Sequence, residues 1–96
     1  MRPADPEQDP RVRELRGRIT AADRVILGAV NERLELVHEL RAHKLAQGWD
    51  FVDREREERL VAGLAAENDG PLSEEGLRAL FADVLALTKR EVERSG

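Results

Sequence analysis

A helical pattern of about 37 residues, which no proline interrupts, dominates this sequence. From Arg11 to Gln47 apolar side chains recur every three or four residues, the spacing of one helix face, and Gly48 then favours a helix end. The apolar stripe consists of Val12, Leu15, Ile19, Ala22, Ile26, Ala29, Leu36 or Val37, and Leu40. Such a helix would be about 55 Å long. No other segment of the 96-residue chain is long enough to cover it.

Two shorter helical patterns follow. The first begins near Asp53 and extends to about Glu67, where the turn Asn68-Asp69-Gly70-Pro71 ends it. Ser73 is a good N-cap for the last helix, which extends to about Glu93 and has acidic residues in its first turn, as the helix dipole favours. No segment has the alternation of a strand. The sequence therefore predicts an all-α fold of one very long helix and two shorter ones.

The apolar stripe of the long helix predicts how the chain assembles. Two short helices cannot cover it, so a second copy of the chain is the simplest cover, which gives an intertwined homodimer. The alternative is a long helix that protrudes into solvent. Residues 1–10 contain Pro3, Pro6 and Pro10 and are expected to be a disordered lead-in. Residues 11–95 are expected to form the helical domain.

Charge and composition argue against several classes of function. The formal net charge is −4, with acidic and basic residues interleaved, and aromatic residues make up 3% of the chain, which does not suit nucleic acid. The sequence contains no cysteine and no apolar run of membrane-spanning length, and its polar, proline-bearing first residues lead us to expect no signal peptide. His38 and His43 lie about 140° apart around a helix, too far for one metal. We therefore expect a cytoplasmic protein without membrane partner, metal or cofactor.

Two cations interrupt the apolar stripe. Arg33 falls seven residues after Ile26 and seven before Leu40, at a position where the pattern requires a core residue. Lys44 lies about 20° from Arg33 around the helix and about 16 Å further along it. Inward-facing cations need anions, because a buried unpaired charge is costly. An internal ion pair with an acidic residue of another helix or an anionic ligand would satisfy them.

Other charged residues allow two interpretations. Arg16 lies about 25 Å from Arg33 and about 100° around the helix, so it is either a surface arginine or reaches the partner subunit's site in an antiparallel dimer. Asp53, Arg56 and Glu57 share one face at the start of the second helix. They belong either to a solvated, ion-paired helix capped by Asp53, or to a face that offers a ligand one cation and two acceptors.

The order and spacing of these residues resemble the all-helical class of chorismate mutases. The motifs are Leu15-Arg16-x-x-Ile19-x-x-x-Asp23, Glu32-Arg33, Lys44 and Asp53-x-x-Arg56-Glu57, within a resemblance that extends from about Val12 to Val92. The turn at residues 67–71 and the following Leu80-Phe81 resemble the mutase domains that some bacteria fuse to DAHP synthases. A DAHP synthase is therefore a candidate partner.

The resemblance implies an isomerase that rearranges chorismate to prephenate, in phenylalanine and tyrosine biosynthesis, without metal or cofactor. It implies two equivalent sites in a homodimer. Each site would contain Arg33, Lys44, Asp53, Arg56 and Glu57 of one subunit and Arg16 of the partner subunit. In the family the arginines hold the two carboxylates of the substrate, the lysine binds the ether oxygen, and the two acids accept the ring hydroxyl. Arg33, Lys44 and Glu57 are the expected catalytic residues.

The last helix departs from the family pattern. The family carries a serine and, four residues later, a glutamine or glutamate that line the substrate, where this chain has Thr88 and Val92. Thr88 keeps a hydroxyl, but Val92 cannot donate to the ether oxygen. Loss of such a donor typically costs about 3 kcal/mol of transition-state stabilisation. We therefore expect either low activity or a different natural substrate.

Three alternatives remain at the level of sequence. Aminodeoxychorismate mutase and isochorismate pyruvate lyase share the fold and bind nearly identical dianions, and an amine in place of the ring hydroxyl would still suit Asp53 and Glu57. A non-catalytic helical module that binds and regulates a DAHP synthase is the alternative from another class. Val92 favours such a module, whereas the six charged site positions favour an enzyme.

Overall fold

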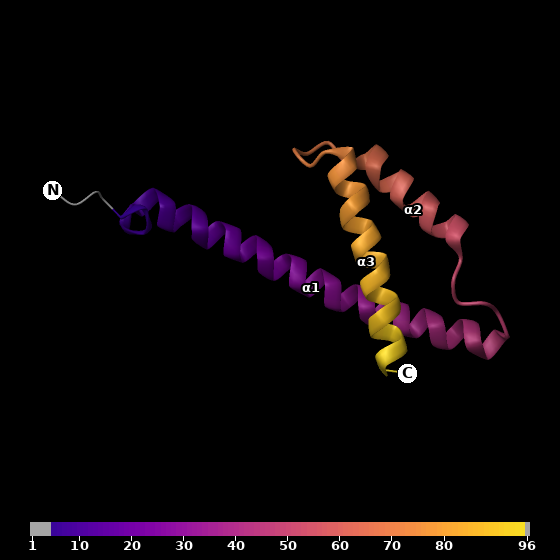
Figure 1. The fold of residues 1–96 in the computed structure, drawn as a ribbon. Coiled ribbons are helices and arrows are strands. Elements are labelled where there is room, and N and C mark those ends of the chain that lie inside the picture. Colours follow the sequence, from indigo (N-terminus) through magenta and orange to yellow (C-terminus); the bar gives the residue numbers. More distant parts are fainter. Residues whose placement is uncertain (1–4, 96) are drawn as a thin grey trace. The chain divides into compact units, whose positions relative to one another are not determined.

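The computed structural model describes residues 5–95 and consists of helices, with no strand in that range (Figure 1). A short 3₁₀ helix, η1 (Pro6–Gln8), precedes three α-helices: α1 (Pro10–Gln47), α2 (Arg54–Glu67) and α3 (Glu74–Ser95). The predicted all-α class, with one very long helix and two shorter ones, is confirmed. Two compact units divide between Arg33 and Leu34, so α1 contributes to both.

The segment before α1 is regular where the structure describes it. Asp5 caps η1, and the Oδ1 of Asp9 accepts hydrogen bonds from the backbone N–H groups of Arg11 (2.8 Å) and Val12 (3.0 Å) at the start of α1. Proline is tolerated at the first position of a helix, where its missing N–H has no partner to lose. Residues 5–9 therefore form capped turns. The disordered lead-in expected over residues 1–10 stays a prediction, and residues 1–4 lie outside the described residues.

Gly48 ends α1 in a left-handed conformation, with a φ of 76°. Its N–H donates to the carbonyl of Leu45 at 3.1 Å, and the N–H of Trp49 donates to the carbonyl of Lys44 at 2.9 Å. These two bonds form the Schellman arrangement, which satisfies the last carbonyls of a helix. The ring of Trp49 then lies edge-to-face against His43, with ring centroids 6.1 Å apart.

Helices α2 and α3 pack against each other and are joined by a short turn (Figure 1). In this turn the side-chain amide of Asn68 donates to the carbonyl of Leu72 at 2.8 Å, and the hydroxyl of Ser73 accepts from the N–H of Gly76 at 3.0 Å. Ser73 thus caps α3, as the sequence predicted. This helix pair positions residues from the start of α2 near residues of α3.

Few side chains are buried within the described chain. The fully or nearly buried ones all belong to α3: Leu77, Thr88 and Val92. Helix α1 contains no buried residue, and its stripe leaves Ile26 61% and Leu36 56% exposed. None of the described helices is both long and apolar enough to span a membrane.

Candidate active site

The first turn of α2 brings three of the predicted site residues together. The backbone of Asp53 is extended, and its Oδ1 accepts a hydrogen bond from the N–H of Arg56 at 3.1 Å. The N–H of Glu57 donates to the carbonyl of Asp53, also at 3.1 Å. Asp53 is therefore the N-cap of α2, and the cap engages one oxygen of its carboxylate. The side chain of Glu57 is 25% exposed.

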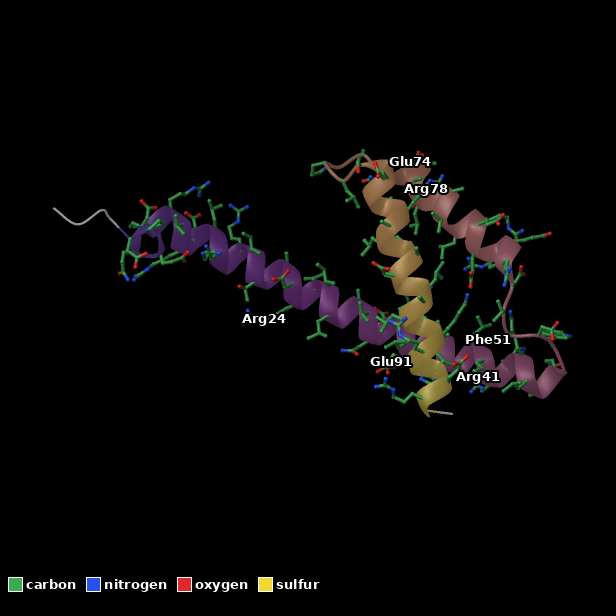
Figure 2. The ribbon with its side chains drawn as sticks, viewed as in Figure 1. Arg24, Arg41, Phe51, Glu74, Arg78 and Glu91 are labelled. Atoms are coloured by element: carbon green, nitrogen blue, oxygen red, sulfur yellow. The ribbon has the colours of Figure 1, made fainter. Side chains whose placement is uncertain are left out.

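Lys44 lies in the last turn of α1 and ties the following loop to the helix. Its Nζ donates to the carbonyl of Phe51 at 3.2 Å, and its side chain is half-buried. Phe51 lies in the loop that connects α1 to α2 (Figure 2). An ammonium has three N–H donors, so this bond leaves two for a ligand. Lys44 thus holds the loop that ends at Asp53.

Lys89, which was not predicted as a site residue, reaches the carboxylate of Glu57 from α3. The Nζ of Lys89 lies 3.2 Å from Oε1 and 3.5 Å from Oε2 of Glu57. Both residues line a cavity of about 470 Å³, whose walls come from α2 and α3. In the sequence, only the position of Lys89 directly after Thr88 indicated that it could belong to the site. Spacing within α3 does not reveal its contact with α2.

Thr88 and Val92 are buried in the described chain. The hydroxyl of Thr88 donates to the carbonyl of Val84 at 2.7 Å, within its own helix. Such a bond to the carbonyl four residues earlier occupies the hydroxyl proton. The side chain of Val92 has no exposed surface. Neither residue lines the cavity that Glu57 and Lys89 share.

Arg16 and Arg33 belong to the N-terminal unit. The guanidinium of Arg16 binds the carboxylate of Glu7 through two hydrogen bonds, 2.6 Å from Nε and 2.5 Å from Nη2. The hydrogen bond and the negative charge of Glu7 raise the pKa of Arg16 above its ordinary value. Arg16 is exposed, as a surface arginine or a residue that serves another subunit would be, and Arg33 is half-buried on α1.

The assembled groups suit an anionic ligand that also carries a hydroxyl. At the start of α2, Lys89 binds the carboxylate of Glu57, Asp53 caps the helix ahead of Arg56, and Lys44 binds the loop that leads to Asp53. No cluster of three or more metal-ligating side chains occurs in residues 5–95. Cations and carboxylates arranged in this way can bind a dianion and stabilise charge that develops on it.

Comparison with known proteins identifies relatives of this chain. The family model described as chorismate mutase type II matches residues 15–93. Form I of the chorismate mutase from Thermus thermophilus is similar, with 35% sequence identity and a TM-score of 0.79, over 81% of this chain and 98% of that chain. Form II of the same enzyme has 34% identity and a TM-score of 0.82, over 88% of this chain and 96% of that chain. No curated protein sequence matches.

Proposed function

Since this chain belongs to the chorismate mutase type II family, we infer that it is an isomerase that rearranges chorismate to prephenate. The observation that carries this inference is the family match over residues 15–93, together with about one-third identity to an enzyme that the chain covers almost completely. The product feeds phenylalanine and tyrosine biosynthesis. Aromatic amino acid synthesis is therefore the pathway that the enzyme serves.

The reaction explains why the site needs charges and no nucleophile. Chorismate rearranges in one unimolecular pericyclic step, in which the ether C–O bond breaks as a C–C bond forms. The enzyme must hold the dianion in its compact reactive conformer and stabilise negative charge that grows on the ether oxygen. Together these effects must supply on the order of 8 kcal/mol, the lower end for enzymes.

We assign the charged residues to these two tasks. Arg33, Arg56 and Arg16 of the partner subunit would hold the two carboxylates of the substrate. Lys44 would bind the ether oxygen, and the two N–H donors that remain after its bond to Phe51 support this role. Asp53 and Glu57 would accept the ring hydroxyl, because residues four apart at the start of a helix share one face.

We further propose that the enzyme is a homodimer in which α1 of one chain covers α1 of the other. Helix α1 contains no buried residue, although its stripe includes Leu15, Ile19 and Ile26. A long apolar stripe on a helix is normally covered by a partner helix. The dimer would also bring Arg16, which is too far from Arg33 to share a site within one chain, to the site of the partner.

Val92 supports a second candidate, a module that acts together with a DAHP synthase. A fully buried valine offers no donor to a substrate, and the turn at residues 67–71 resembles that of mutase domains fused to such synthases. In this alternative, the chain would bind and regulate a DAHP synthase without any turnover of chorismate. Aminodeoxychorismate and isochorismate are the related substrates to test in parallel.

The decisive experiment follows the loss of chorismate absorbance with the purified chain. The wild type should consume chorismate and form prephenate, and Arg33→Ala should lower kcat/KM about a hundredfold, because a charged partner of a carboxylate is removed. Arg24→Ala is the matched control, since Arg24 is an exposed arginine on the same helix. Circular dichroism establishes that each variant is folded. No turnover by a large excess of wild-type enzyme would contradict the proposal.

A further inference from the structure

Glu57 poses an electrostatic problem for the function proposed above. A carboxylate that accepts the ring hydroxyl must lie close to a substrate with two negative charges. Asp53 and Glu58 add further negative charge in the same turns of α2, which Arg54 and Arg56 offset only in part. Like charges at such short distances repel each other, most strongly where water is partly excluded. A cation that neutralises Glu57 without covering its oxygens would remove this difficulty.

Lys89 provides such a cation. Its Nζ lies 3.2 Å from Oε1 and 3.5 Å from Oε2 of Glu57, so it bridges both oxygens from one side. A carboxylate has about four lone-pair positions, which leaves acceptor capacity for a hydroxyl. The pair joins residues 32 positions apart in sequence, on two helices. In contrast, Glu74 and Arg78 pair within the first turns of α3 (Figure 2).

The surroundings of the pair favour a functional role over a stabilising one. The side chains of Lys89 and Glu57 are 40% and 25% exposed, and pairs with this much solvent access contribute little to stability. Both residues line the open cavity between α2 and α3. Val92, three residues further along α3, offers no polar group. Lys89 is therefore the charged residue of α3 that reaches the carboxylate at the start of α2.

We propose that Lys89 is a positioning residue that holds the Glu57 carboxylate, and offsets its charge, so that it can accept the ring hydroxyl of the dianionic substrate. This inference depends on the chorismate mutase activity proposed above. Without Lys89, the carboxylate would rotate toward solvent and repel the substrate. The consequence is weaker substrate binding more than slower chemistry, because the hydroxyl is held in the ground state and in the transition state alike.

The test compares steady-state constants for chorismate. Lys89→Met should raise KM about fivefold and change kcat little, and Lys89→Arg should restore most of the loss because the positive charge returns. Arg90→Gln is the matched control, since it removes one positive charge from an exposed position next to Lys89, and it should leave KM unchanged. Lys89→Gln serves as the second variant if Lys89→Met does not fold.

A double-mutant cycle with Glu57→Gln separates positioning from other roles. If Lys89 acts through Glu57, Lys89→Met should change KM by less than about twofold in the Glu57→Gln background. An equal rise of KM in both backgrounds would overturn the proposal, because Lys89 would then act on the substrate independently. An unchanged KM in Lys89→Met alone would also overturn it, while wild-type turnover would leave the mutase activity established. A wild type without turnover would instead refute the proposed function itself.

Discussion

The contacts of single charged side chains determine what each can offer to a substrate. Glu7 binds Arg16 through Nε and Nη2, which are two of the five N–H donors of a guanidinium and leave three for another anion. Because Glu7 raises the pKa of Arg16 above its ordinary value, Arg16 stays positively charged around neutral pH. We therefore expect no pH dependence of activity that arises from Arg16.

Val92 gives the clearest test at the residue scale. Replacement by glutamine would place an amide where the side chain has no exposed surface, and the free energy of unfolding should fall by about 1–3 kcal/mol unless the amide finds a hydrogen-bond partner. Urea denaturation measures the change, with the exposed-site variant Arg90→Gln as control. If Val92→Gln is instead as stable as the wild type and has a higher kcat, the amide reaches the substrate and supplies the missing donor.

The sequence predicted charged positions better than it predicted their contacts. Asp53, Arg56 and Glu57 were expected on one face, and the structure brings them together because they belong to one helical turn. Lys89 was not expected, because its contact with Glu57 depends on how α2 and α3 pack. The burial of Val92 was not expected either, because a resemblance to a family supplies roles and not accessibility. The roles of these residues remain predictions.

Helix ends are the features of the elements that the sequence predicted well. Gly48, Asp53 and Ser73 were each expected at an end of a helix, and each lies there in the structure. Capping depends on two to four neighbouring residues, so local sequence suffices to predict it. The start of α1 was predicted to within one residue, because the helix was expected from Arg11 and begins at Pro10, which occupies a first-turn position as Pro6 does in η1.

Asp53 has two proposed tasks, as N-cap of α2 and as a hydroxyl acceptor, and substitutions can separate them. Asp53→Asn should keep the stability of the protein, because asparagine caps a helix as well as aspartate does, whereas Asp53→Ala should lower it by about 1 kcal/mol. If the carboxylate also binds substrate, both variants should raise KM. Thermal unfolding and steady-state kinetics on the same samples test this. A normal KM for Asp53→Asn would restrict Asp53 to capping.

At the scale of the whole molecule, the exposed stripe of α1 predicts that folding and dimer formation are coupled. Ile26→Glu should place a charge in the proposed interface and give a monomer of reduced helicity, because burial of a charge is costly. Thr20→Glu adds the same charge at an exposed position on the side of α1 that faces away from the stripe, and it should leave the dimer intact. Analytical ultracentrifugation distinguishes the two. A wild-type monomer at micromolar concentration would contradict the homodimer.

Shared sites in a homodimer also predict complementation between two inactive variants. An Arg16→Ala chain paired with a Lys44→Ala chain would contain one site with both substitutions and one site with neither. Random mixing of the chains should therefore restore up to about a quarter of the wild-type activity, since about half of the dimers would be mixed. The measurement is chorismate turnover after the unfolded variants are combined and refolded together. If the co-refolded mixture is as inactive as the two separate variants, Arg16 does not belong to the partner's site.

The edge-to-face contact of Trp49 with His43 has a practical consequence. The chain contains one tryptophan and no tyrosine, so its long-wavelength ultraviolet emission comes from a single ring. This ring stands four residues before Asp53, in the loop that Lys44 holds through Phe51. The wavelength of indole emission depends on the polarity around the ring. Movement of this loop when a ligand binds should therefore shift the emission of Trp49, and no added dye is needed to detect it. Binding of a bicyclic dicarboxylate that mimics the transition state could thus be followed by intrinsic tryptophan fluorescence.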